Sequence, residues 1–179
     1  MNATTQKATF GSGCFWCTEA VFKNVKGIVK VTPGYAGGTE PNPSYQSIHY
    51  RNTGHAEVVQ IEYDPRVISY KTLVKIFFGT HDPTQVNGQG NDTGPEYRSI
   101  ILYHDQNQKQ TAESVKEKLE NNNTFDKPIA TEIKALDHFT EAEPEHHNYY
   151  DKNPGQPYCQ IVISPKLAKL RAQYKDYLK

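Results

Sequence analysis

Two cysteines three residues apart, Cys14 and Cys17, are candidates for covalent chemistry near the start of the chain. Cys14 follows a Gly-Ser-Gly run (residues 11–13), which predicts a turn from a strand into a helix. At the first turn of a helix, unpaired backbone N–H groups and the helix dipole stabilise a thiolate. The sequence therefore indicates that Cys14 is a nucleophile with a favoured thiolate form.

The third cysteine, Cys159, leaves one thiol over in any pairing, and three cysteines are too few for a disulfide framework. Such a set is typical of redox chemistry, nucleophilic catalysis or metal binding. Cys17 could close a disulfide with Cys14, or it could be half of a zinc site completed by Cys159 and a histidine. Because the sequence has no second C-x-x-C or spaced Cys/His pair, we expect no metal.

Two large aromatic residues, Phe15 and Trp16, follow Cys14 directly. Consecutive helical residues point about 100° apart, so the two cannot both share the direction of Cys14. We expect at least one of them to lie at the rim and to wall a pocket beside the thiol. The alternative is that both belong to the core of an amphipathic helix.

A second candidate is Glu57, in a segment (54–63) that reads as a strand. Strand alternation puts Glu57 on one face with Val59 and Ile61, together with His55 and Tyr63. A carboxyl in that environment is desolvated, which raises its pKa and keeps it protonated near neutrality. A protonated acid can deliver a proton to a leaving oxygen. A strand-end carboxylate paired with Lys or Arg remains the alternative.

The loop 89–98 offers a carboxylate, an amide, a hydroxyl and a phenol just before an expected strand. It fits either the polar side of a site or a turn with solvated side chains. A calcium loop is a weaker interpretation, because the spacing does not match an EF-hand.

Strands and helices must position these residues. The pattern predicts strands over 7–13, 28–31, 55–63, 97–103 and 131–136, and helices over 14–22, 69–79, 105–120, 143–152 and the C-terminal tail. A segment of about twenty residues (32–52) reads as a long irregular loop, which is uncommon and more often functional than not. Without a regular alternation of strands and helices, the fold class is α+β.

Composition and length exclude several classes of protein. The 179 residues suit a single domain spanning 1–179. Twenty basic and twenty acidic residues balance, without runs of one sign, which argues against nucleic acid or an anionic membrane as a partner. We find no apolar stretch long enough to cross a bilayer and no signal-peptide core in residues 1–7, so the expected location is cytoplasmic.

Several short blocks resemble the peptide methionine sulfoxide reductase A family. The blocks are Gly13-Cys14-Phe15-Trp16, Tyr35-Ala36-Gly37-Gly38, Asn42-Pro43-Ser44-Tyr45, Gly54-His55-Ala56-Glu57, Gln89-Gly90-Asn91-Asp92, Tyr97-Arg98-Ser99, and Asn153-Pro154 before Tyr158-Cys159. They come in family order and span positions 11–160, which is most of the chain.

The resemblance implies a role for each matching residue. Cys14 would attack the sulfoxide sulfur, while Phe15 and Trp16 would form the pocket for the S-methyl group. Glu57 would protonate the sulfoxide oxygen. Three further side chains would assist on the polar side: Tyr45 and Tyr97 by hydrogen bonds and Asp92 by organising the site.

The family resemblance also implies a reaction course and a fold. Methionine leaves, Cys14 becomes a sulfenic acid, and a second thiol condenses with it to a disulfide that thioredoxin reduces. The substrate is the S epimer of methionine sulfoxide, free or in proteins, and neither a metal nor an organic cofactor is required. The implied fold has two layers, with a mixed sheet flanked by helices and long ordered loops. We expect a monomer.

The resolving thiol is the point where this chain departs from the family pattern. Many members have Gly in place of Cys17 and use a C-terminal cysteine, which Cys159 matches. Pro154, Gly155 and Pro157 suggest a mobile segment around Cys159. We favour a relay in which Cys17 captures first and Cys159 follows, with direct resolution by Cys159 left open.

Two other functions remain as alternatives. One is a thioredoxin-like thiol–disulfide oxidoreductase built on Cys14 and Cys17, although Phe-Trp stands inside the motif instead of Gly-Pro. The other is a non-enzymatic binding module with an aromatic pocket for a methyl-sulfur or methylammonium group.

Overall fold

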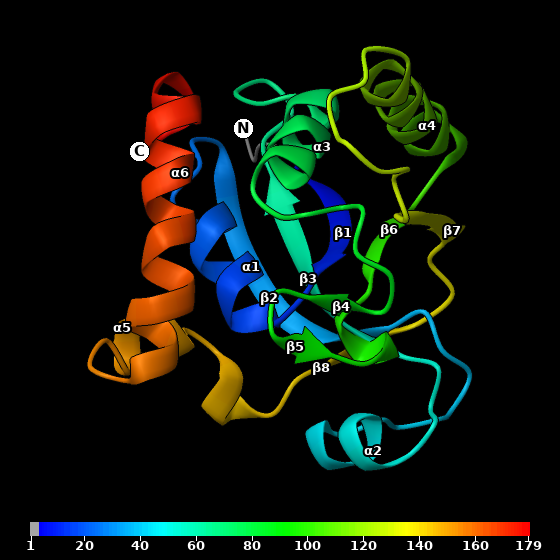
Figure 1. Cartoon of the computed structure of the whole chain (residues 1–179), viewed down its shortest axis with the longest axis vertical. Helices are drawn as coiled ribbons and strands as arrows, with labels where there is room; N and C mark the ends of the chain where they lie inside the picture. Colours follow the sequence, from blue (N-terminus) through cyan, green and yellow to red (C-terminus); the bar gives the residue numbers. More distant parts are fainter. Residues whose placement is uncertain (1–3) are drawn as a thin grey trace.

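Six strands form the main sheet of the computed structural model, which describes residues 4–179 (Figure 1). The strands are β1 (Gln6–Ser12), β2 (Ile28–Ala36), β3 (Ala56–Tyr63), β6 (Ser99–Tyr103), β7 (Glu132–Ala135) and β8 (Phe139–Glu141). Their order is β7-β6-β1-β3-β2-β8. Neighbouring strands are antiparallel except β6 and β7, which are parallel. The expected mixed sheet of an α+β fold is confirmed.

The helices and short elements lie between and around these strands. The α-helices are α1 (Phe15–Lys23), α2 (Tyr45–Tyr50), α3 (Tyr70–Gly79), α4 (Gln106–Asn121), α5 (Tyr149–Lys152) and α6 (Ser164–Tyr174). A small hairpin joins β4 (Gly88–Gln89) to β5 (Asp92–Thr93). Single helical turns are η1 (Pro95–Tyr97), η2 (Pro144–His146), η3 (Cys159–Ile163, a π-helical turn) and η4 (Lys175–Tyr177).

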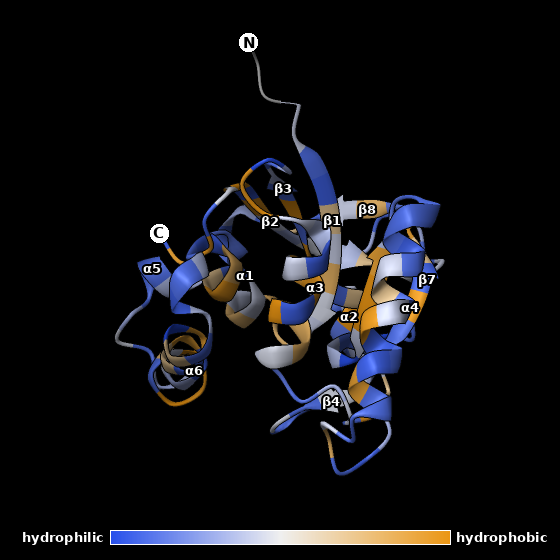
Figure 2. Ribbon diagram, turned by 90° about the horizontal axis from the view of Figure 1, so that it is seen from above, coloured by the Kyte–Doolittle hydropathy of each residue, from blue (hydrophilic) through white to orange (hydrophobic). Residues whose placement is uncertain are grey.

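The hydrophobic core lies mainly between the sheet and helices α1, α3, α4 and α6. Val59, Ile61 and Tyr63 of β3 belong to this large cluster, whereas Ala56 and Val58 belong to a small cluster with Ile100 and Leu102. The predicted alternation of β3 is therefore confirmed. Figure 2 shows hydrophobic segments where α1 and α3 approach the strands, and a largely hydrophilic α4.

Two glycines allow β1 to turn into α1 close to β3. A Cβ on Gly11 would lie 2.8 Å from Ile100 and 2.9 Å from the carbonyl oxygen of Glu57. Gly13 has a φ of +100°, and a Cβ there would meet the Gln89 side chain at 2.7 Å. Because neither position tolerates a larger residue, the chain reaches Cys14 directly beside β3 and the β4–β5 hairpin.

The structure differs from the expected elements in several places. The expected helix over 143–152 is divided into η2 and α5, because Asn148 between them has a φ of +54° and interrupts the right-handed helix. Part of the expected irregular loop 32–52 is regular: β2 continues to Ala36, and α2 begins at a capping box in which Ser44 and Ser47 bond reciprocally. Cys159, which we expected in a mobile segment, lies in η3, which leads straight into α6. In the described part of the chain, we find no helix with the length and apolar character needed to cross a membrane.

Candidate active site

The Cys14 thiol lies at the boundary between β1 and α1, as the N-cap residue of the helix, and is only 7% exposed. Burial is the main factor that raises the pKa of this thiol well above its usual value. A hydrogen bond with the Cys17 thiol and the charge of Glu57 raise it further. The expected thiolate preference is therefore wrong for this state, because desolvation outweighs the helix start. Cys14 is therefore a protonated thiol in this state of the protein.

The Glu57 carboxyl lies in β3 beside the first turn of α1 and is almost fully buried. Its Oε2 accepts a hydrogen bond from the Phe15 backbone N–H at 2.8 Å, and its Oε1 lies 3.1 Å from His49 Nε2. Burial raises the pKa of Glu57, although these hydrogen bonds act in the opposite direction. The carboxyl thus has the desolvated environment that strand alternation predicts.

Two phenols, Tyr45 of α2 and Tyr97 of η1, lie near this carboxyl. Burial raises the pKa of both hydroxyls, and the nearby charges of Glu57, Cys14 and Asp92 raise them further. Both hydroxyls are consequently protonated donors at any physiological pH. The structure brings together the five polar residues that the sequence assigned to one site, which are Cys14, Tyr45, Glu57, Asp92 and Tyr97.

The two aromatic residues after Cys14 have different environments. Phe15 is fully buried, with its ring 5.7 Å from that of Tyr35 and 6.4 Å from that of Tyr45. Trp16 is only partly buried; its ring stacks on Tyr149 with centroids 3.6 Å apart and planes 6° apart. Trp16 is therefore the more exposed of the two rings, whereas Phe15 belongs to the hydrophobic core. A substrate pocket walled by these rings stays a prediction.

Cys14 lines a cavity of about 420 Å³. It is lined by Cys14, the tip of the β4–β5 hairpin including Asp92, and residues of the η3–α6 segment. Asp92 Oδ2 accepts a hydrogen bond of 2.6 Å from the Tyr158 hydroxyl, and that hydroxyl lies 3.6 Å from Cys17 Sγ. Asp92 thus holds Tyr158 against the cysteine pair.

All three cysteines are buried free thiols, and electrostatic interactions connect Cys17 with each of the other two. The hydrogen bond with Cys14 is the main factor that lowers the pKa of Cys17; burial opposes it and the Lys166 ammonium adds to it. Burial raises the pKa of Cys159, and the charge of Cys17 raises it further. Cys17 therefore affects the pKa values of both other cysteines.

Several residues of the site were missed by sequence reasoning because their partners are distant in the chain. Glu143 accepts hydrogen bonds from the Tyr35 hydroxyl at 2.9 Å and the Tyr45 backbone N–H at 3.1 Å, which fixes the start of α2. His49 lies one helical turn after Tyr45, so helical spacing in this segment is the signal that would have indicated it.

The other side chains missed by sequence reasoning surround Trp16. The Trp16 indole donates to His146 Nδ1 at 3.1 Å. Glu19, buried in α1, accepts from the Asn148 backbone N–H with both oxygens at 3.0 Å. Because Asn148 precedes Tyr149, this contact positions the ring on which Trp16 stacks.

A possible metal-binding group in the described part of the chain consists of Glu143, Glu145 and His146, whose ligand atoms lie within 4.8 Å of one another. Both Glu143 oxygens and one His146 nitrogen already have protein hydrogen-bond partners. The group therefore serves as a hydrogen-bonding cluster behind the aromatic pocket.

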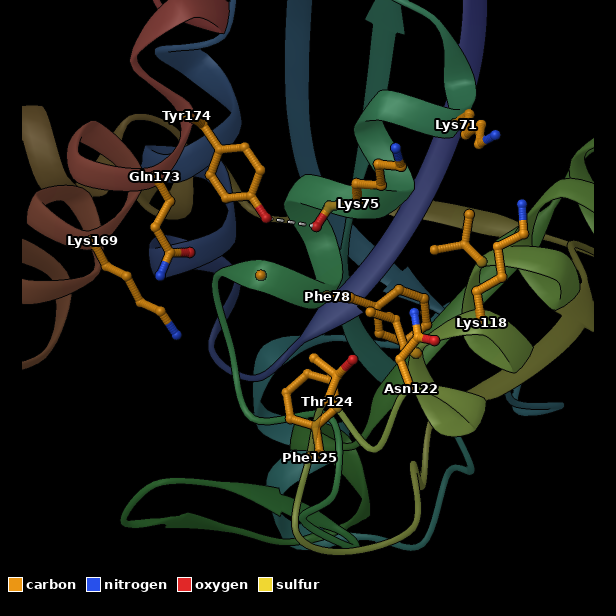
Figure 3. Close-up of a pocket in the computed structure, with 13 residues that line it drawn as sticks. Lys71, Lys75, Phe78, Lys118, Asn122, Thr124, Phe125, Lys169, Gln173 and Tyr174 are labelled. Atoms are coloured by element: carbon orange, nitrogen blue, oxygen red, sulfur yellow. Dashed lines mark hydrogen bonds between the residues drawn. The ribbon is translucent and has the colours of Figure 1, made fainter.

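Another cavity, of about 650 Å³, lies elsewhere, between α3, α4 and α6 (Figure 3). Lysines surround an apolar floor that includes Phe78 and Phe125, and the Tyr174 hydroxyl donates to the Lys75 carbonyl. Its lining has neither a thiol nor a carboxylate, so it is not the place of the thiol chemistry.

Comparisons with known proteins agree with this geometry. The family model "Peptide methionine sulfoxide reductase" matches residues 6–178. A peptide methionine sulfoxide reductase MsrA of Saccharolobus solfataricus is 51% identical over 172 residues, covering 96% of each chain. Reduced Mxr1 of Saccharomyces cerevisiae has a TM-score of 0.80 at 34% identity, covering 89% of this chain and 91% of that one. Mxr1 in complex with Trx2 has a TM-score of 0.57 at 26% identity, covering 83% and 87%.

The match over nearly the whole chain and the thiol–carboxyl–aromatic geometry lead to the same conclusion. The chain belongs to the peptide methionine sulfoxide reductase family and is a thiol-dependent oxidoreductase that reduces methionine sulfoxide to methionine.

Proposed function

We propose that the chain reduces the S epimer of methionine sulfoxide, free or in proteins, and that Cys14 is the nucleophile. The observation that carries this assignment is the contact between the start of α1 and Glu57: the Phe15 N–H binds the carboxyl at 2.8 Å. Because Phe15 follows Cys14 directly, the thiol and the acid share one corner of the site. A sulfoxide with its sulfur at Cys14 has its oxygen toward Glu57, Tyr45 and Tyr97.

Glu57 supplies the proton in this proposal. The sulfoxide oxygen is a poor leaving group until it is protonated, and a buried, protonated carboxyl suits that task. The phenols of Tyr45 and Tyr97, held neutral by their surroundings, donate hydrogen bonds to the same oxygen. As negative charge develops on the oxygen, these donors stabilise it in a desolvated site.

Phe15 and Trp16 hold the S-methyl group. The stacking of Trp16 on Tyr149 fixes the indole plane at the rim, and Phe15 closes the inner side. Asp92 acts on the polar side through the Tyr158 hydroxyl, which lies beside Cys17. The pocket therefore selects a small apolar group next to a strongly polar oxygen.

Recycling follows a relay in this proposal. After methionine leaves, the Cys14 sulfenic acid condenses with a thiol and releases water. Cys17 is supported as first partner because its thiol is hydrogen-bonded to Cys14 and has a lowered pKa. The Cys159 thiol then attacks the Cys17 sulfur of the Cys14–Cys17 disulfide, which forms a Cys17–Cys159 disulfide and releases the Cys14 thiol. The effect of the Cys17 charge on the pKa of Cys159 supports this contact. Thioredoxin reduces the final disulfide, a role that the complex of Mxr1 with Trx2 supports.

We further propose that residues 1–179 form one domain that works as a monomer in the cytoplasm, without nucleic acid, metal or organic cofactor. The match of one family model to residues 6–178 supports the single domain.

Turnover of the two separated epimers of a methionine sulfoxide peptide, with dithiothreitol as reductant, tests the proposed function. We expect methionine from the S epimer and none above background from the R epimer. Equal rates for both epimers, or reduction of insulin disulfides in preference to either, would contradict the proposal.

A further inference from the structure

The carboxyl of Glu57 is joined to a second carboxylate through an imidazole. His49 Nε2 lies 3.1 Å from Glu57 Oε1, and His49 Nδ1 lies 3.3 Å from Glu96 Oε1. Only 1% of the Glu57 side chain is exposed, whereas the exposed fraction is 14% for His49 and 12% for Glu96. The three groups come from three different elements, β3, α2 and η1.

The outer end of this chain opens on its own surface cavity. His49 and Glu96 line a hollow of about 430 Å³ together with Arg51, His55 and uncharged residues of segments 48–54 and 95. Glu57 and Cys14 do not line it; Cys14 lines the separate cavity beside the β4–β5 hairpin. His49 is thus reached from a hollow that is separate from the cavity that Cys14 lines.

We propose that His49 passes protons to Glu57 from the hollow beside Glu96, so that the acid of the reaction is a Glu57–His49 pair rather than a lone carboxyl. The inference rests on the proposed role of Glu57. His49 does not touch the substrate in this account and is a positioning and proton-transfer residue.

Proton transfer in this pair balances. As the Cys14 sulfur bonds to the sulfoxide sulfur, Glu57 gives its proton to the oxygen and takes one from His49 Nε2–H. The imidazole becomes neutral and keeps the proton on its Nδ1, which faces Glu96 Oε1. The proton that leaves the Cys14 thiol goes to solvent, and an equivalent proton from the hollow restores the imidazolium. Glu57 is therefore reprotonated through His49 from the hollow beside Glu96, and not through the cavity that Cys14 lines.

The charged surroundings of His49 fit this role. Burial lowers the pKa of His49, but the hydrogen bond and charge of Glu57 and the charge of Glu96 outweigh it, so the net shift is upward. Aromatic neighbours are Tyr45, with its ring centroid at 4.3 Å, and Tyr97 at 5.6 Å.

The remaining titratable groups near His49 act on it only weakly. His146 stacks on the far side of Tyr45, with ring centroids 4.4 Å apart. Of the other groups at the hollow, Arg51 pairs with Glu40, and His55 bonds to the Gly38 N–H and the Glu40 carbonyl oxygen. The Glu96 carboxylate is therefore the group that stabilises the His49 imidazolium when Glu57 is protonated.

The test is the pH profile of the single-turnover rate with the S epimer. Glu96→Gln removes a negative charge from His49, so the pH at which the rate declines on the basic side should fall by about one unit. Glu40→Gln, which removes a carboxylate beside the same hollow without touching His49, should leave the profile in place. In a His49→Gln background, Glu96→Gln should cause no further shift.

An unshifted profile in Glu96→Gln, or an equal shift with and without His49, would overturn the relay. These outcomes differ from failure of the proposed function itself. In that case the wild-type protein would not reduce the S epimer, or Glu57→Gln would react as fast as wild type.

Discussion

Replacing Glu57 by Gln removes the proton that the proposed mechanism needs while keeping the shape of the side chain. The new amide oxygen can accept the Phe15 N–H that now binds Oε2, and the amide NH₂ can donate to His49 Nε2 when the imidazole is neutral with its proton on Nδ1. Both contacts of the carboxyl are thus preserved, so we expect the free energy of unfolding to change little. Only the acid function is lost.

The expected effect of Glu57→Gln follows from what general acid catalysis contributes, about 10²–10⁴-fold in rate. This corresponds to about 3–5 kcal/mol of transition-state stabilisation at about 1.4 kcal/mol per factor of ten. The wild-type rate should also decline as pH rises through the raised pKa of the Glu57–His49 pair, because the acid is loaded only below it. The Gln variant has no such decline.

Rapid quench of a single turnover with the S epimer measures the chemical step apart from recycling. Binding of the substrate, followed by Trp16 fluorescence, serves as the control and should be nearly unchanged. A Gln variant whose chemical step stays within a few-fold of wild type, with the same decline at high pH, would show that Glu57 is not the acid.

Three further predictions concern the pocket, the relay and stability. Trp16→Ala should raise KM and reduce the preference for the methyl sulfoxide over bulkier analogues, as measured by kcat/KM for both; unchanged values would make Trp16 a core residue only. Peptide mapping after one turnover without reductant should find a disulfide in both Cys17→Ser and Cys159→Ser; loss of disulfide in Cys159→Ser alone would exclude a role for Cys17. Burial of His81 lowers its pKa to about 3, so the unfolded chain binds its proton at higher pH than the folded one. Stability should therefore fall by up to about 1.4 kcal/mol per unit as pH drops from about 6.5. Urea unfolding at pH 6.5 and 5 should show a smaller loss in His81→Gln, and an equal loss in both proteins would contradict the assignment.

Local sequence patterns predicted the parts of the site that depend on local geometry. Helix and strand periodicity are local properties, which explains why α1, β3 and the face of Glu57 follow the expectation. The thiolate preference of Cys14 failed because desolvation depends on what covers the thiol, and η3 and the hairpin that cover it lie far along the chain.

The missed elements share the same physical reason. β8 is three residues long, which is too short to show the alternating pattern of a strand in the sequence. It forms because it pairs with the end of β2. Pro154, Gly155 and Pro157 predicted a mobile segment around Cys159, yet η3 follows them directly, and Cys159 and Ile163 are buried in the core cluster. Strand pairing decided the first case and tertiary burial the second.

The central claim, that Cys14 attacks the sulfoxide sulfur, is tested most directly by one turnover of Cys14→Ser with the S epimer. We expect wild type to yield methionine and to lose thiols, and Cys14→Ser to yield none, since loss of the attacking thiol costs several orders of magnitude. The variant should unfold at the same urea concentration as wild type. Methionine formation above about one per cent of the wild-type rate would move the nucleophile to another residue.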